Sequence, residues 1–325
     1  MSFPDIPPSF QGIVCPVEYP SFLHTAVTTS MMKKLSRPGL ADLSLSVIYD
    51  VPDTAPHGVQ TDNAVSVQLE LRNELLLFGT WDVTIRLGGT LLRSLEPWTE
   101  TVVYSENDCD YLEIDIPLER DYRLQRHFLL DTAHRILILA DCVLWDGDGK
   151  FKPKTLEYES SLFYSPTLRT KEANGATELT FFSTKFARAA PLFRVLPLDW
   201  PEWKNAVTDG SEFRTEESNL ILRKRTEGRA FFLPLFFDLN ANRLKHPYTW
   251  RSLTVGENLK KVSDDRAVGF RIQLGREQYL LYRSMTPLAN RTVLGHNLID
   301  DFCYGHFDGK TGVEPLVAVQ QEIDC

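Results

Sequence analysis

Tyr111-Leu112-Glu113-Ile114-Asp115-Ile116 decides the fold class, because polar and apolar side chains alternate along it. Successive side chains of a strand point to opposite faces, so the alternation predicts a β-strand with one buried face and one wet face. Residues 64–71 and 270–274 alternate in the same way. Residues 136–140 are apolar throughout instead, which predicts a strand covered on both faces.

Turn residues divide the chain into many short strands. Hairpins are predicted over residues 81–95 about Gly88-Gly89, over 219–239 about Glu227-Gly228, and over 270–282 about Gly275-Arg276. Many short strands with closely spaced turns are typical of a sandwich. We therefore expect an all-β fold, in which residues 41–325 form one large antiparallel β-sandwich with a division into two subdomains near 191–210.

Helical spacing is found only near the N-terminus. One short helix within an N-terminal segment, residues 1–40, is predicted from Phe22, Leu23, Ala26, Val27 and Met31, which recur every three to four positions. Lys33 and Lys34 suit the end of that helix, and Pro38-Gly39 suits its termination.

Composition and charge exclude several classes of protein. With 325 residues, of which 43% are apolar, the chain can bury a sizeable core, so disorder is excluded. The net charge of −9 is uneven: residues 1–160 carry 13 basic and 24 acidic side chains, and residues 161–325 carry 22 and 20. An acidic half and the lack of a dense basic patch argue against a nucleic-acid partner. An anionic ligand is expected on the second half.

The cysteines and the apolar segments bear on the compartment. Five widely spaced cysteines without a C-x-x-C pair favour reduced, mostly buried thiols. No signal peptide is visible and no apolar stretch is long enough to span a bilayer, so no membrane partner is expected. The expected location is cytoplasmic if this is the complete chain, and extracytoplasmic if it is a fragment of a longer secreted protein. The oligomeric state stays open.

Four residues are candidates for catalysis. His127 and His134 lie on either side of a predicted turn, where a hairpin would bring both imidazoles toward one rim as a general base. Arg126 or Arg283 would steady a substrate carboxylate. The alternative is that both histidines are polar surface residues or hydrogen-bonded core residues.

The acidic run that contains Glu113 and Asp115 also allows two interpretations. The two carboxylates share one strand face, about 7 Å apart. They could act as an acid/base pair at a sugar, or they could form a solvated strand face.

Aromatic and amide-rich segments are candidates for ligand binding. Trp200, Trp203 and Trp250 could stack on sugar rings or fill one end of the sandwich. Asn290 and Arg291 belong to a donor-rich loop that could bind hydroxyl or carboxylate groups, or could instead hold itself together. Asp146–Lys150 fails as a calcium loop because lysine stands at the fifth position and Phe151 at the sixth. No metal site and no cofactor are predicted, since no matching motif occurs.

Residues 111–143 resemble a known family. Tyr111-Leu112-Glu113, the basic strand Leu124-Gln125-Arg126-His127-Phe128-Leu129-Leu130 and the apolar strand Arg135-Ile136-Leu137-Ile138-Leu139-Ala140-Asp141-Cys142-Val143 are similar to the β-sandwich (supersandwich) domain of heparinase II/III-like polysaccharide lyases. In those lyases the catalytic Tyr and His lie largely on an N-terminal helical toroid, and no such region is present here. The resemblance implies a supersandwich without the full catalytic apparatus.

Three functions are therefore weighed. The first is a non-catalytic sandwich that binds or accompanies an acidic polysaccharide through the arginine-rich second half and the tryptophans. The second is a sugar-acting enzyme, a lyase or epimerase, with a histidine base. The third is a subunit whose acidic half docks on a basic partner. Sharing a fold does not transfer an activity, so we rank them in that order.

Overall fold

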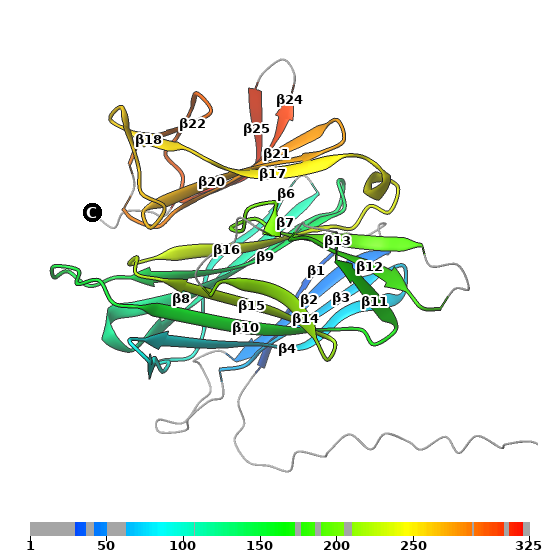
Figure 1. Cartoon of the computed structure of the whole chain (residues 1–325), viewed down its shortest axis with the longest axis horizontal. Helices are drawn as coiled ribbons and strands as arrows, with labels where there is room; N and C mark the ends of the chain where they lie inside the picture. Colours follow the sequence, from blue (N-terminus) through cyan, green and yellow to red (C-terminus); the bar gives the residue numbers. More distant parts are fainter. Residues whose placement is uncertain are drawn as a thin grey trace, which may run out of the picture.

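The computed structural model describes residues 30–36, 42–50, 63–106, 108–172, 177–185, 190–204, 210–287, 289–308 and 312–320. These residues form four antiparallel sheets (Figure 1). We name the sheets by position: an outer sheet, a central sheet, a cover sheet and a small sheet. The outer, central and cover sheets are stacked as three layers, with the cover sheet at the top of Figure 1. The all-β sandwich predicted from the sequence is confirmed.

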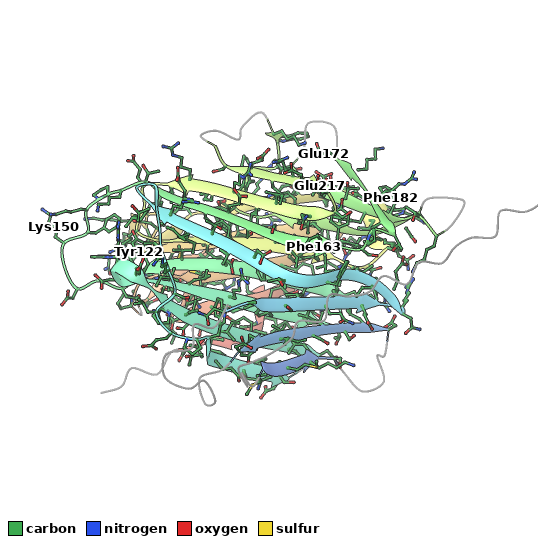
Figure 2. The ribbon with its side chains drawn as sticks, turned by 90° about the horizontal axis from the view of Figure 1, so that it is seen from below. Tyr122, Lys150, Phe163, Glu172, Phe182 and Glu217 are labelled. Carbon is green, nitrogen blue, oxygen red and sulfur yellow. The ribbon has the colours of Figure 1, made fainter. Side chains whose placement is uncertain are left out.

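The outer sheet has the order β1-β2-β3-β4-β10-β15-β14, and β5 pairs with β4. Its strands are β1 (Ser30–Leu35), β2 (Leu43–Asp50), β3 (Val65–Leu71), β4 (Glu74–Leu87), β5 (Thr90–Leu91), β10 (Leu156–Tyr164), β14 (Glu212–Glu216) and β15 (Asn219–Thr226). Figure 2 views the molecule from this side, with Phe163 and Glu217 toward one end and Tyr122 and Lys150 toward the other.

The central sheet has the order β11-β12-β13-β16-β9-β8-β7-β6. Its strands are β6 (Thr99–Glu106), β7 (Cys109–Leu118), β8 (Tyr122–Asp131), β9 (Ile136–Trp145), β11 (Leu168–Glu172), β12 (Leu179–Ser183), β13 (Pro191–Pro197) and β16 (Phe231–Asp238). The 3₁₀ turn η2 (Glu119–Asp121) joins β7 to β8.

The cover and small sheets are built from the C-terminal third of the chain. The cover sheet consists of β17 (Tyr248–Leu253), β20 (Ala267–Leu274), β21 (Glu277–Ser284), β24 (Phe302–Asp308) and β25 (Gly312–Val319). The small sheet consists of β19 (Lys260–Lys261), β18 (Val255–Glu257), β22 (Arg291–Val293) and β23 (His296–Leu298). The 3₁₀ turn η4 (Arg243–Lys245) precedes β17.

Two separate cores lie on the two faces of the central sheet. Leu137 and Leu139 of β9 pack toward the outer sheet, and Ile136 and Ile138 pack toward the cover sheet. This confirms the predicted burial of both faces of residues 136–140. Because each buried Leu or Ile loses its water contacts and fills space, truncation to Ala costs about 2–5 kcal/mol.

The wet face predicted for residues 111–116 is wrong. Leu112, Ile114 and Ile116 do pack against the outer sheet, but Tyr111 and Glu113 on the other face are fully buried under the cover sheet. Alternation correctly separated the two faces of β7. It could not show that a third layer covers the polar one.

The predicted N-terminal helix is also wrong in its described part. Phe22–Val27 lie outside the described residues, and from Ser30 the chain is strand β1. Met31 to Leu35 pair with β2 in regular antiparallel register, so Lys33 and Lys34 fall on opposite faces of an edge strand. No helix of seven or more residues occurs in the described ranges of the chain.

Two of the three predicted hairpins are confirmed. β4 turns into β5 at Gly88-Gly89, whose positive φ angles of 57° and 79° favour glycine, and β20 turns into β21 at Gly275-Arg276. Residues 219–239 do not form a hairpin. β15 pairs with β10 and β14 in the outer sheet, whereas β16 pairs with β9 and β13 in the central sheet. The Glu227-Gly228 link therefore carries the chain between layers.

The segment 191–210 contains β13, which pairs with β12 and β16 inside the central sheet. The division into two subdomains at this segment stays a prediction. The chain leaves the two lower layers only after β16, when η4 leads into the cover sheet.

Candidate functional site

His127 and Arg283, two of the predicted catalytic residues, meet in a buried polar cluster between the central and cover sheets. The Tyr111 hydroxyl donates to Glu113 Oε2 at 2.7 Å and lies 2.8 Å from His127 Nδ1. Arg283 Nη1 lies 3.3 Å from Glu113 Oε2, and its Nη2 donates to Gln125 Oε1. We call Tyr111, Glu113, Gln125, His127 and Arg283 the buried cluster.

Burial and neighbouring charges shift the pKa values of Glu113 and His127 in the buried cluster. Burial alone would raise the pKa of Glu113, but Arg283 and His127 outweigh it and hold that pKa well below its usual range. Burial lowers the pKa of His127, although Glu113 opposes the shift. His127 is 1% exposed, and Phe232 and Phe302 pack against its ring. A substrate would reach these atoms only if the sheets separated.

Arg126 points to the opposite face of the central sheet from His127. Its Nε donates to Asp141 Oδ1 at 3.0 Å, and Asp141 also accepts from the Tyr158 hydroxyl at 2.6 Å. The guanidinium lies 4.3 Å from the ring centre of Trp81. Arg126 is therefore a satisfied core residue in this structure, and the sheet itself separates it from His127.

His134 lies at the rim, as the sequence predicted, but away from His127. Its Nδ1 lies 2.8 Å from Asp131 Oδ2, and its ring stacks on His306. The hydrogen bond to Asp131 raises the pKa of His134, although partial burial opposes the shift. About a third of the side chain is exposed. The two histidines thus occupy unlike environments.

The predicted ligand-binding residues are dispersed. Trp200 and Trp250 are buried, and Trp250 Nε1 donates to Trp200 O at 2.8 Å; Trp203 is 58% exposed. Arg291 is fully buried and donates to Glu257 and to Ser284, as expected for a loop that is stabilised by its own side chains. Asn290 beside it is exposed.

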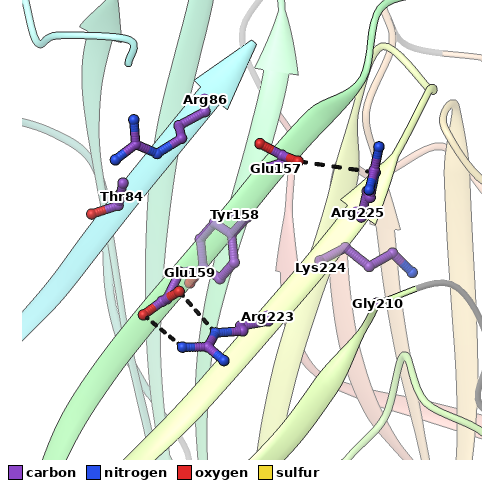
Figure 3. A pocket seen from close by; sticks show the side chains of 9 residues that line it. All are labelled: Thr84, Arg86, Glu157, Tyr158, Glu159, Gly210, Arg223, Lys224 and Arg225. Atoms are coloured by element: carbon purple, nitrogen blue, oxygen red, sulfur yellow. Dashed lines mark hydrogen bonds and ion pairs between the residues drawn. The ribbon is translucent and has the colours of Figure 1, made fainter. Parts of the chain in front are cut away.

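A groove on the solvent face of the outer sheet brings together charges from three strands (Figure 3). Its volume is about 380 Å³. β4 contributes Thr84 and Arg86, β10 contributes Tyr158 and two glutamates, and β15 contributes Arg223 to Arg225. The lining residues, including Gly210, are Thr84, Arg86, Glu157, Tyr158, Glu159, Gly210, Arg223, Lys224 and Arg225. We call this the outer groove.

Strand register produces the outer groove. In the antiparallel pairing, Glu157 stands opposite Arg86 on one side and Arg225 on the other, and Glu159 stands between Thr84 and Arg223. Residues two apart in a strand share a face, so all of these side chains point into solvent. The result is a ladder of alternating charge across the sheet.

The arginines of the outer groove differ in how firmly they are held. Arg223 donates to Glu159 through Nε and Nη2 at 2.8 and 3.2 Å, and its Nη1 forms an ion pair with Glu212 at 3.2 Å. That hydrogen bonding lowers the pKa of Glu159 and raises the pKa of Arg223. Arg225 is 3.9 Å from Glu157. Arg86 has no carboxylate within ion-pair distance in the described part of the chain.

Sequence reasoning missed the outer groove. The Arg223-Lys224-Arg225 run is short, and the sequence shows no dense basic patch. A usable signal was present, because Glu157 and Glu159 share the two-residue spacing of Arg223 and Arg225. Pairing them, however, requires knowing that β10 and β15 are neighbours.

The described residues also limit metal chemistry and membrane insertion. Among them, no group of three or more His, Cys, Asp or Glu side chains could hold a metal ion. None of their helices is long and apolar enough to cross a membrane. Cys109, Cys142 and Cys303 are buried free thiols, and burial raises the pKa of Cys142 and of Cys303 to about 12. The predicted reduced thiols are confirmed for these three.

Comparisons with known proteins find structural similarity alone. No family model matches the chain, and no curated protein matches it. A solved heparinase III gene product has a TM-score of 0.46 at 8% identity, covering 79% of this chain and 41% of its own. Heparan sulfate lyase HepC from Pedobacter heparinus has a TM-score of 0.47 at 10% identity, covering 75% and 40%.

This chain thus spans about two fifths of the length of those structures. The distant, partial resemblance predicted from the sequence is confirmed. At this identity it concerns the fold, and the activities named for those proteins are theirs.

Proposed function

We propose that this protein binds an acidic polysaccharide, without acting on it, at the outer groove. One observation carries the proposal: Arg86, which has no ion pair among the described residues, and Arg225, 3.9 Å from Glu157, stand on either side of Glu157 on an open sheet face. Arginine forks bind carboxylate and sulfate groups through paired hydrogen bonds. Thr84 supplies a partner for sugar hydroxyls.

Local charge favours an anionic ligand even though the whole chain is acidic. Of the four basic side chains in the groove lining, Lys224 pairs with Asp199 and Arg223 with Glu159 and Glu212, so Arg86 and Arg225 supply the local positive charge. Ion pairs between exposed side chains contribute only about 0–1 kcal/mol. A ligand anion can therefore replace Glu157 at Arg225 at little cost.

The buried cluster supports a binding role over catalysis at His127. A general base must come within hydrogen-bond reach of the proton it removes. His127 and Arg283 are enclosed between two sheets, where His127 Nδ1 lies against the Tyr111 hydroxyl and Arg283 Nη1 pairs with Glu113.

Calorimetry with a uronate-containing oligosaccharide and a neutral oligosaccharide of equal length tests the proposal. We expect binding of the acidic chain only, weakened at least tenfold in the double variant Arg86→Ala and Arg225→Ala. Arg251→Ala, which removes an exposed arginine on β17 of the cover sheet, is the matched control and should bind normally. Equal binding of the neutral chain, or an unchanged double variant, would refute the proposal.

A second candidate function is a sugar-acting enzyme that uses His134. The favouring observation is its partly exposed imidazole, oriented by Asp131 at 2.8 Å in the manner of a general base. Incubation with uronate-containing polysaccharide should then yield unsaturated or epimerised products, and His134→Ala should abolish them. Product formation that persists in His134→Ala would remove this candidate.

A further inference from the structure

A second basic hollow lies beside the outer groove, at the β4–β5 hairpin. It has a volume of about 460 Å³ and is lined by Thr90, Leu91, Arg93, Glu119 and Arg120. Neither Arg93 nor Arg120 has a carboxylate within ion-pair distance among the described residues. Arg93 and Arg120, which are 27 positions apart, therefore meet at one hollow with Glu119 as the acidic residue of its lining.

Backbone contacts fix the two arginines relative to each other. The Glu119 N–H donates to Arg93 O at 2.9 Å, and the Arg93 N–H donates to Glu119 Oε2 at 3.3 Å. Leu95 N–H donates to Pro117 O at 2.9 Å and extends the same connection. The segment after β5 is thereby attached to the turn between β7 and β8.

Arg120 occupies a conformation that costs free energy. Its φ of 63° and ψ of 38° are left-handed, and Asp121 after it has a φ of 61°. For residues other than glycine such backbone conformations cost free energy, and Arg120 shares them with other turn residues of this chain. Among the described residues, the exposed guanidinium of Arg120 forms no ion pair.

The second hollow continues the outer groove. Arg86, which lines the groove, stands directly opposite Leu91, which lines the hollow, in the β4–β5 register. Arg225 on β15 is separated from β5 by β10 and β4. With strands about 4.8 Å apart, the distance from β15 to β5 is about 14 Å, and Arg93 comes two residues after β5 in the chain.

We infer that the outer groove and the second hollow form one surface for an extended polyanion. This inference rests on the proposed function and specifies its ligand: an acidic chain with anionic groups at both ends of a span greater than about 14 Å. A short acidic saccharide occupies the groove alone. A long one also places a carboxylate or sulfate between Arg93 and Arg120.

The test compares an acidic disaccharide with an octasaccharide of the same repeat. Arg93→Ala combined with Arg120→Gly should weaken octasaccharide binding about tenfold and leave disaccharide binding unchanged. Glycine is chosen at position 120 because it accepts the left-handed conformation, so the variant should fold at least as well. Arg86→Ala with Arg225→Ala should weaken both ligands, and Arg251→Ala neither.

The outcomes separate the two proposals. If the Arg93 and Arg120 variant binds the octasaccharide as wild type does, the extended surface is refuted and the proposed function stands. If wild-type protein binds neither saccharide, the proposed function fails and the extended surface fails with it.

Discussion

Glutamate and arginine face each other in two regions of this molecule with opposite consequences. In the buried cluster, Glu113 and Arg283 are sealed between two sheets, and each is needed to neutralise the other. In the outer groove, Glu157 and Arg225 carry the same charges at 3.9 Å in water. The residue types are alike, so it is the covering layer that makes one pair structural and leaves the other open to ligands.

Removing one carboxylate from each region should give the largest contrast. Glu113→Ala leaves Arg283 charged and unpaired in the core, and we expect a loss of about 3–5 kcal/mol in the free energy of unfolding. Glu159→Ala on the wet face should cost about 1 kcal/mol or less, because exposed pairs contribute little. Urea denaturation of both variants measures the difference, and equal losses would contradict the comparison.

A paired replacement makes this contrast sharper. Glu113→Leu combined with Arg283→Met removes both buried charges and should recover most of the stability lost in Glu113→Ala, since no uncompensated charge remains. If the double variant is as unstable as Glu113→Ala, the unpaired charge of Arg283 is not the cause of the lost stability.

The contributions of His127 and His134 to the free energy of unfolding should change with pH in opposite directions. His127 has a lowered pKa when folded, so below about pH 6.5 the unfolded chain binds the extra proton and stability falls. His134 has a raised pKa, so its contribution is complete below about pH 6.5 and is lost as the pH rises through the folded value.

Imidazole proton resonances followed by NMR check this prediction. His134 should titrate above its ordinary value of 6.5, and His127 should remain neutral to lower pH. Coincident midpoints would mean that the two environments do not differ as described.

The smallest expected effect comes from the outer groove. Glu157→Gln removes the carboxylate that lies 3.9 Å from Arg225 and should strengthen binding of an acidic oligosaccharide severalfold, while stability changes by less than about 0.5 kcal/mol. Raising the salt concentration should reduce the gain, since exposed charges are screened. Calorimetry at two salt concentrations measures this gain in affinity. Weaker binding by Glu157→Gln than by the wild type would show that Glu157 contacts the ligand.

The strands could be predicted from sequence because their patterns are local. Residues 136–140 are apolar on both faces, so their double burial follows from the residues themselves. The burial of Glu113 could not be predicted, since its partner Arg283 is 170 positions away. Strands β15 and β16 are joined by turn residues at Glu227-Gly228, but such a turn does not show whether the two strands pair with each other, and they lie in different sheets.

The distinction between local patterns and contacts of distant residues applies to the candidate sites as well. His134 and Asp131 are three residues apart, so their contact at one rim was within reach of the sequence. The outer groove depends on contacts across 64 positions, as between Arg223 and Glu159. Register between distant strands is set by packing of the whole core, which a local pattern does not contain.

The chain order of the cover sheet has a consequence for folding kinetics. Its strands β17, β20, β21, β24 and β25 follow one another as a meander, whereas the two lower sheets are interleaved along the sequence. Contacts between nearby segments form faster than contacts between distant ones. We therefore expect the strands of the cover sheet to pair with one another early in folding. The cover sheet would then dock on the central sheet late. That docking step would remove water from the Glu113 and Arg283 charges and would limit the folding rate.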